Sequence, residues 1–180
     1  NKIGSDVPTC TNPEYFKDAF NAVQTLVNNN LLLAGHDISA GGMIVTLLEM
    51  CFANTEGGIE IELDKFGKAD LVKILMAENP GVIVQVADNN KTEFKKILDE
   101  AGVGYIKLGV PTDERLIQVK KDGAEYQFGI DYLRDVWYST SYLLDRKQSF
   151  NGCAKARFEN YKMQPLEMVF NKDFTGTLAQ

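Results

Sequence analysis

The regular alternation of short apolar runs with longer segments of helical spacing constrains the fold of this chain more than any other feature. The expected helices cover residues 13–27, 43–54, 70–78, 91–101 and 131–146, and the expected strands cover residues 31–34, 58–63, 82–87, 105–110, 116–119 and 125–128. Helices that alternate with strands and end in a hairpin predict an α/β layered sandwich, in which helices pack on a mixed β-sheet.

Residues at the ends of these segments support the assignment. Asn12 can cap a helix that has Pro13 in its first turn, and Asp131 can cap the last long helix. Asp122-Gly123 is a strong signal for a hairpin turn. Leu31–Ala34 is wholly apolar, which predicts a strand buried on both faces. Residues 82–110 have the pattern of a β-α-β segment.

The length predicts one domain, or one domain with a tail, because 180 residues fall within the roughly 100–200 residues of a typical domain. Residues 1–11 are expected to be a lead-in and residues 12–147 the domain. Residues 148–180 are expected to be a tail or linker, with a weak strand at Met168–Phe170. The sequence begins with neither an initiator Met nor an apolar signal region, which indicates a piece of a longer chain.

The charge balance argues against nucleic-acid binding. Lys and Arg number 19 against 25 Asp and Glu, a net charge of −6, so there is no basic stripe to neutralise phosphates along a polynucleotide. No apolar run approaches the roughly 18–20 residues of a membrane span. The cysteines Cys10, Cys51 and Cys153 are far apart, which favours a reducing compartment, expected to be the cytoplasm. Cys51 lies in an apolar helical stretch, which predicts a core position rather than a catalytic thiol.

The stretch Gly35–Gly42 departs from the pattern of a plain core. It joins an expected strand to an expected helix, which is where ligands tend to bind in layered α/β folds. Paired glycines let backbone N–H groups approach a phosphate, and the following helix adds unpaired N–H groups and a positive dipole end. Asp37 is a hard oxygen donor suited to Mg²⁺, and the Ser39 hydroxyl can hydrogen-bond a phosphate. These residues could therefore form an anion-binding turn with a magnesium ligand at its edge.

A purely structural interpretation accounts for the same residues. Ser39 could cap the next helix, Asp37 could be a turn residue, and Gly41-Gly42 could only permit close packing. The pattern is not a P-loop, because no Lys-Ser/Thr pair follows the glycines, and it is not a dinucleotide fingerprint. Spacing alone leaves both interpretations open and leans toward the structural one.

Other candidate residues have simpler interpretations. His36 is the only histidine, and a lone His is more often a hydrogen-bonded structural residue than a catalyst. The alternating acids Glu60, Glu62 and Asp64 fit the solvent-facing side of a strand, and the aromatic run Trp137–Tyr142 fits a packing helix. Ser-His-Asp hydrolysis is not expected, because no Gly-x-Ser-x-Gly elbow occurs.

Residues 36–53 begin with His36-Asp37-Ile38-Ser39-Ala40-Gly41-Gly42-Met43 and continue into an expected helix that contains Thr-Leu-Leu-Glu-Met-Cys-Phe-Ala. This stretch resembles the signature of the phosphoribosylformylglycinamidine synthase family, whose usual form is His-Asp-x-Ser-Asp-Gly-Gly-Leu followed by a Thr-Leu-x-Glu-Met-x-Phe-Ala helix. Three further stretches are similar to family segments: Leu75–Val86, Gly109–Thr112 and Trp137–Tyr142. The resemblance runs from about Asn12 to Arg146, and the tail from Gln148 resembles the linker that leads to a glutaminase domain.

The resemblance implies that this chain is the second AIR-synthase-type C-terminal domain of a large ligase. That enzyme converts formylglycinamide ribonucleotide to the amidine in purine biosynthesis, using ATP and ammonia from glutamine. Its glutaminase cysteine and catalytic histidine are expected outside this piece, so no catalytic residue is assigned here and the piece alone is expected to be inactive. The expected partners are the missing N-terminal and glutaminase domains of the same polypeptide, with no nucleic acid and no membrane.

The same resemblance implies that Asp37 binds Mg²⁺ and that Ser39 contacts a nucleotide, ATP or ADP, in an auxiliary and mainly structural pocket. Ala40 stands where the family usually has Asp, which removes a carboxylate beside the loop. Weak binding by the piece alone is expected, because half of the phosphate and metal ligands would come from the absent N-terminal partner. Two alternatives remain. One is a structural or interaction domain whose loop binds nothing, and the other is an ATP-using relative such as aminoimidazole ribonucleotide synthetase or selenophosphate synthetase.

Overall fold

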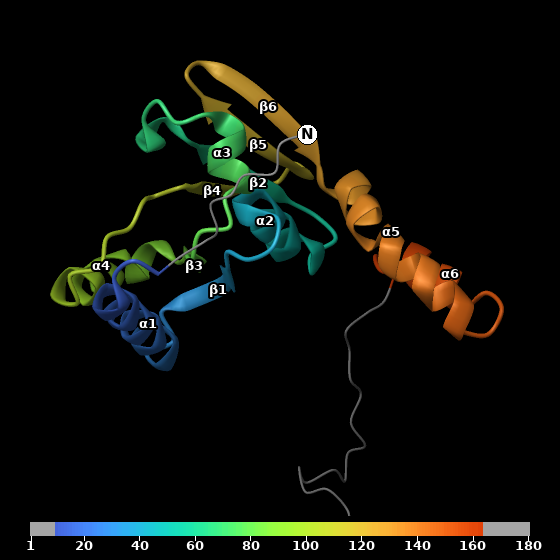
Figure 1. Ribbon diagram of the computed structural model, residues 1–180, viewed down its shortest axis with the longest axis horizontal. Helices are drawn as coiled ribbons and strands as arrows, with labels where there is room; N and C mark the ends of the chain where they lie inside the picture. The colour runs from blue at the N-terminus through green and yellow to red at the C-terminus, as the bar shows by residue number, and fades with distance from the viewer. Residues whose placement is uncertain (1–9, 164–180) are drawn as a thin grey trace, which may run out of the picture. The chain divides into compact units, whose positions relative to one another are not determined.

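The computed structural model describes residues 10–163 as two compact units, one that ends at Val136 and one that begins at Trp137 (Figure 1). The helices are α1 (Pro13–Asn28), α2 (Gly42–Phe52), α3 (Leu71–Met76), α4 (Lys91–Glu100), α5 (Ile130–Gln148) and α6 (Cys153–Glu159), with short 3₁₀ helices η1 (Asp64–Phe66) and η2 (Asp88–Asn90). The strands are β1 (Leu32–Asp37), β2 (Gly58–Glu62), β3 (Val82–Val86), β4 (Gly109–Thr112), β5 (Leu116–Lys121) and β6 (Ala124–Gly129). Most of the predicted lead-in and the predicted strand at Met168–Phe170 lie outside the described residues.

A four-stranded mixed sheet forms the larger part of the first unit, in the order β4-β2-β5-β6. Strands β2 and β5 are parallel, with Ile59 opposite Ile117, and the other two pairs are antiparallel. The β5–β6 hairpin turns at Asp122 and Gly123, which have φ angles of 50° and 76°. Positive φ at both positions is what a two-residue hairpin turn requires. The predicted α/β class with a mixed sheet is confirmed.

Strands β1 and β3 form a separate two-stranded antiparallel sheet, in which Asp37 lies opposite Val82. The predicted β-α-β segment is therefore wrong as a continuous unit, because β3 pairs with β1 while β4 pairs with β2. Strand β4 also begins at Gly109 rather than at Tyr105. The ring of Tyr105 instead packs edge-on against Phe94 of α4, with ring centroids 5.6 Å apart.

Helix α2 supplies the centre of the main hydrophobic core. Leu47 is 1% exposed, and it belongs to the same cluster as Ile61 of β2 and Ile117 and Val119 of β5, which are also almost fully buried. Ile74 and Leu75 of α3 belong to the same cluster. Helix α2 thus packs against both the four-stranded sheet and α3, and the apolar spacing predicted from the sequence is the face that it buries.

A smaller apolar cluster joins α1 and α4, which lie side by side (Figure 1). Ala22 and Leu26 of α1 pack with Leu98 of α4. The prediction that Leu31–Ala34 is buried on both faces is wrong, because Leu33 is 62% exposed. The reason is that β1 has one neighbouring strand only among the described residues, and the helices cover part of its surface.

The second unit is a pair of helical segments from α5 and α6. The ring of Phe158 on α6 stacks on Tyr142 of α5, with centroids 4.7 Å apart. Arg157 donates to Asp145 from Nε at 2.9 Å and from Nη2 at 2.6 Å, and these hydrogen bonds lower the pKa of Asp145. Helix α6 lies within residues 148–180, which are expected to be a tail or linker. This helix is held on α5 by the aromatic stacking and the ion pair.

The burial of α2 leads to a prediction with an internal control. Leu47→Ala is expected to lower the free energy of unfolding by about 2–5 kcal/mol, because it leaves a cavity in the core. Leu33→Ala removes the same atoms from an exposed position of β1 and is expected to change it by less than about 0.5 kcal/mol. Urea unfolding followed by circular dichroism measures both, and equal losses would contradict the packing described here.

Candidate functional site

Asp37 lies at the end of β1 with its carboxylate directed to solvent. Its side chain is 73% exposed, and its backbone pairs with Val82 of β3. The next residue, Ile38, donates its backbone N–H to the carbonyl of Gly81 at 2.8 Å, which extends the strand pairing by one step. Asp37 is therefore the last residue of a hydrogen-bonded strand, and the interpretation of this position as a turn residue is wrong.

The loop of residues 38–41 carries Ser39 on the surface. Its carbonyl accepts a hydrogen bond from Gly42 N–H at 3.0 Å, and its hydroxyl has no partner among the residues that the structure describes. The residue at the N-cap of α2 is Gly41, with a φ of 86° and no capping side chain. The alternative that Ser39 caps the helix is therefore wrong, and its hydroxyl is available to a ligand.

The backbone N–H groups of the two glycines are already used within the chain. Gly41 N–H donates to the Glu78 carboxylate at 2.8 Å, and Gly42 N–H donates to Ser39. The expectation that both glycine N–H groups are open to a phosphate is wrong for this structure. The carboxylate of Glu78 does, however, place a negatively charged oxygen at the start of α2, where a helix favours negative charge.

Gly42 is required for close packing. Its φ is 71°, and a Cβ atom built at this position would lie 2.6 Å from the backbone carbon of Met76 at the end of α3. No other residue fits this approach, because a backbone atom cannot move aside as a flexible side chain can. The close-packing alternative from the sequence is confirmed for this glycine.

His36 bridges the end of β1 and helix α2. Its Nδ1 lies 2.7 Å from the carbonyl oxygen of Asp37, and its Nε2 lies 3.1 Å from Oε2 of Glu49. Thr46, which is buried, places its Oγ1 3.1 Å from the same Asp37 carbonyl. Sequence reasoning identified His36 and Asp37 but missed Thr46, Glu49 and Glu78. A signal was present for two of them, since Thr46 and Glu49 are polar residues one turn apart in an otherwise apolar helix.

The donor set at Asp37 fits Mg²⁺ held together with phosphate oxygens. Magnesium in proteins is usually bound by one or two carboxylates, by water and by substrate phosphates. Asp37 offers one solvent-facing carboxylate, which meets this requirement in part. Within residues 10–163, no three His, Cys, Asp or Glu side chains gather closely enough to hold a metal ion by themselves. The residues present therefore fit a metal–nucleotide complex better than a metal ion alone.

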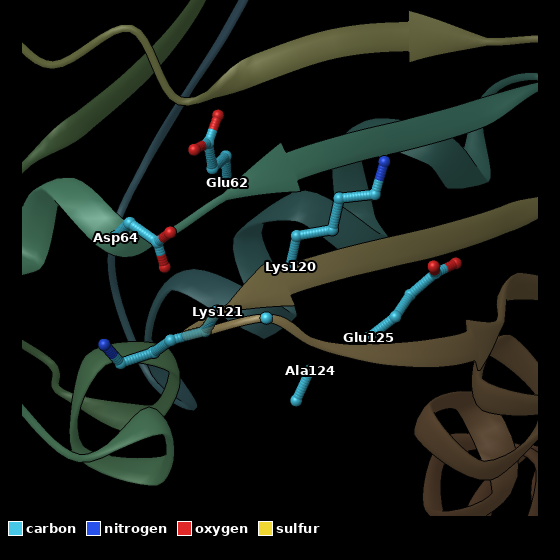
Figure 2. Close-up of a pocket in the computed structure, with 7 residues that line it drawn as sticks. Glu62, Asp64, Lys120, Lys121, Ala124 and Glu125 are labelled. Atoms are coloured by element: carbon cyan, nitrogen blue, oxygen red, sulfur yellow. The ribbon is translucent and has the colours of Figure 1, made fainter.

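The acidic strand residues of β2 are part of a charge-balanced surface. Lys120 on β5 donates to Glu60 at 2.7 Å, and this hydrogen bond raises the pKa of Lys120. Asp64 accepts from the backbone N–H of Asp122 at 2.7 Å and so supports the hairpin. Figure 2 shows the surface hollow at this end of the sheet, lined by Glu62, Asp64, Lys120, Lys121, Gly123, Ala124 and Glu125. These contacts agree with the solvent-facing strand that the alternation predicts for Glu60 and Glu62, whereas Asp64 lies beyond the strand, in η1.

The aromatic run at residues 137–142 packs within its own unit. Tyr138 and Tyr142 both stack on Phe158, at centroid distances of 6.0 and 4.7 Å. The prediction of a packing helix is confirmed for these two tyrosines.

Comparisons with known proteins show what the chain is similar to. The family model described as AIR synthase related protein, C-terminal domain, matches residues 3–122. A probable phosphoribosylformylglycinamidine synthase, chloroplastic/mitochondrial, from Arabidopsis thaliana is 35% identical over 91% of this chain and 12% of the relative. A human phosphoribosylformylglycinamidine synthase is 31% identical over 84% of this chain and 12% of the relative. The chain thus spans about an eighth of the length of these curated relatives.

The fold agrees with a solved structure. A PurL protein of T. maritima, complexed with ATP, has a TM-score of 0.61 at 16% identity, over 69% of this chain and 22% of that one. At this level of identity, the likeness concerns the fold. In the part of the chain that the structure describes, no helix is both long and apolar enough to cross a membrane.

The cysteines give a prediction that tests the absence of a catalytic thiol in the core. Burial raises the pKa of the Cys51 thiol, although the nearby Arg115 lowers it in part, whereas Cys10 and Cys153 are free and exposed. Because the thiolate is the reactive form, native protein at pH 8 is expected to react with a thiol reagent at Cys10 and Cys153 and not at Cys51. Mass spectrometry of the labelled peptides measures this, with urea-unfolded protein as the control that labels all three. Rapid labelling of native Cys51 would contradict the burial.

Proposed function

This chain belongs to the family of AIR synthase related C-terminal domains, and we propose that it contributes to a site for magnesium and a nucleotide in a larger ATP-dependent enzyme. The proposed enzyme is a phosphoribosylformylglycinamidine synthase, which would convert formylglycinamide ribonucleotide and glutamine to formylglycinamidine ribonucleotide. The two curated relatives carry that name, and the structural neighbour holds ATP.

The observation that carries the proposal is the exposed carboxylate of Asp37 at the end of β1, two residues before the Ser39 hydroxyl. Asp37 would bind Mg²⁺, and the Ser39 hydroxyl would donate a hydrogen bond to a nucleotide phosphate. A bound Mg²⁺ neutralises phosphate charge. This chain would hold the Mg²⁺ ligand Asp37 in place, because the Asp37 backbone pairs with β3 and its carbonyl accepts a hydrogen bond from Thr46 of α2.

The proposed site is auxiliary and incomplete within this chain. Ala40 gives no carboxylate at the position where the family usually has Asp, so one negatively charged group is absent beside the loop. The remaining ligands would come from an N-terminal partner domain of the same polypeptide. No residue of this chain is proposed as catalytic, and residues 12–147 alone are proposed to be inactive.

The proposed organisation places residues 12–147 as the domain and residues 148–180 as the linker toward a glutamine amidotransferase domain. The proposed location is the cytoplasm, a reducing compartment. It is supported by three free cysteines. The name of the Arabidopsis relative gives a chloroplast or mitochondrial location for that protein.

One observation favours a second candidate, a structural domain whose loop binds nothing. Glu78 already accepts from the Gly41 N–H, so a carboxylate of the chain stands where a phosphate oxygen would bind. A domain of this kind would hold the partner domains of the enzyme in place without a nucleotide. The two candidates differ in whether Asp37 matters for binding.

Calorimetry of the full-length protein with ADP separates the candidates. Asp37→Asn is expected to weaken ADP binding in the presence of Mg²⁺ by at least about 10-fold, since loss of even an outer-shell partner of a metal ion costs about 10–100-fold. Asp18→Asn, which removes an exposed carboxylate from α1, is the matched control and is expected to bind like the wild type.

Titration with Mg²⁺ alone is expected to give no measurable binding at this site, because one carboxylate is a weak magnesium site without phosphate. Unchanged Mg²⁺-dependent binding in the Asp37→Asn variant would favour the structural candidate.

A further inference from the structure

We propose that Glu49, His36 and Thr46 act together as positioning residues, which fix the direction in which Asp37 presents its carboxylate to a magnesium–nucleotide ligand. This inference rests on the proposed function of Asp37. It concerns residues for which no functional role was expected, and it depends on the contacts between α2 and the end of β1.

The first part of the argument is that both ring nitrogens of His36 are held by oxygen atoms. Nδ1 lies 2.7 Å from the carbonyl of Asp37, and Nε2 lies 3.1 Å from the Glu49 carboxylate. The imidazole is 31% exposed and the Glu49 side chain 23%, so solvent competes only in part for these contacts. In either tautomer the neutral ring donates one hydrogen bond, from Nδ1 to the Asp37 carbonyl or from Nε2 to the Glu49 carboxylate. Glu49 on α2 therefore helps to set the position of the ring.

The second part is that the Asp37 carbonyl is contacted by the Thr46 hydroxyl as well as by the His36 ring. Thr46 Oγ1 lies 3.1 Å from this carbonyl and 3.3 Å from the carbonyl of Gly42, and Thr46 is 1% exposed. The backbone of Asp37 also pairs with Val82 of β3. The peptide unit at Asp37 is thus fixed by a strand neighbour, a hydroxyl and an imidazole.

The third part concerns the carboxylate itself. Oδ1 of Asp37 lies 3.4 Å from Nδ1 of His36, while the side chain as a whole is 73% exposed. The imidazole therefore faces one carboxylate oxygen, and the other oxygen has no polar partner among the described residues. An arrangement of this kind leaves one oxygen directed outward to a ligand, with its direction set by the ring.

The fourth part is that the supporting helix is rigid. Thr46 and Glu49 are three residues apart on α2 and therefore lie on one face of the helix. The neighbouring Leu47 and Leu48 are buried in the main core. A helix that is held by the core transmits its position to the strand end. A ligand group held in advance by such packing and hydrogen bonds binds more tightly, because less freedom is lost on binding.

The test measures the apparent affinity for Mg²⁺ at a fixed ADP concentration in the full-length protein. Glu49→Ala removes the partner of Nε2 and is expected to weaken Mg²⁺ binding by about 10-fold, the effect of losing an outer-shell partner. Binding of ADP in the presence of a chelator is expected to stay unchanged, because the contacts hold the metal ligand and not the nucleotide. Glu93→Ala on α4 removes a surface carboxylate away from the site and is the matched control.

Two substitutions at His36 separate positioning from simple stability. The amide nitrogen of Asn occupies a place close to that of Nδ1, so His36→Asn can still donate to the Asp37 carbonyl. The amide nitrogen of Gln corresponds to Nε2, so His36→Gln keeps the contact with Glu49 and loses the contact with Asp37. The structure predicts that His36→Asn retains more Mg²⁺ affinity than His36→Gln at equal melting temperature. A merely structural role would lower the melting temperature and leave the Mg²⁺ affinity of folded protein unchanged.

The outcomes distinguish this inference from the proposed function. If Asp37→Asn loses Mg²⁺ binding but Glu49→Ala and His36→Gln keep it, the positioning role is overturned and the proposed function stands. If Asp37→Asn itself keeps Mg²⁺ binding, the proposed function is overturned and the positioning role with it. Should Glu49→Ala fail to fold, the comparison of the two His36 variants decides the question.

Discussion

The packing of α2 against the four-stranded sheet and α3 is the interaction on which the rest of this structure depends. Leu47 and the sheet residues Ile61, Ile117 and Val119 are almost fully buried together, and Gly42 lets the start of the helix approach the backbone of α3. Burial of apolar surface at this level is the main source of stability in a domain of this size. Since α2 also contacts the end of β1, the core and the candidate site share one element.

That sharing explains why an apolar helix carries polar residues. Thr46 is buried and Glu49 is half-buried, and a buried polar group costs free energy unless it is hydrogen-bonded. In this chain each has a partner at the end of β1, through the Asp37 carbonyl or through His36. The same junction brings Glu78, from the segment after α3, to the N–H of Gly41. The loop after β1 is therefore held at its first end by contacts with α2 and at its last end by Glu78, while the Asp37 carboxylate remains exposed.

Under the proposed function, the exposed carboxylate of Asp37 at the end of β1 would be one of several ligand groups that different domains of a larger enzyme supply. The chain spans 12% of the curated relatives, and its fold matches 22% of the structural neighbour. Under the proposed function, the partner domain would supply the ligands that are missing around Asp37. The main core does not depend on those ligands, because α2, α3 and the four-stranded sheet bury one another.

The elements that could be predicted correctly from the amino-acid sequence are those whose signals are local. The cap and proline at Asn12-Pro13, the hairpin at Asp122-Gly123 and the apolar spacing of α2 predicted structures that exist, because turn geometry and helical periodicity depend on neighbouring residues. Three features became visible only in the tertiary structure: β3 and β4 belong to different sheets, Leu33 is exposed, and the Glu78 carboxylate accepts a hydrogen bond from Gly41 N–H. These features join residues far apart in the chain, such as Gly41 and Glu78, and no local pattern encodes the pairing of distant segments.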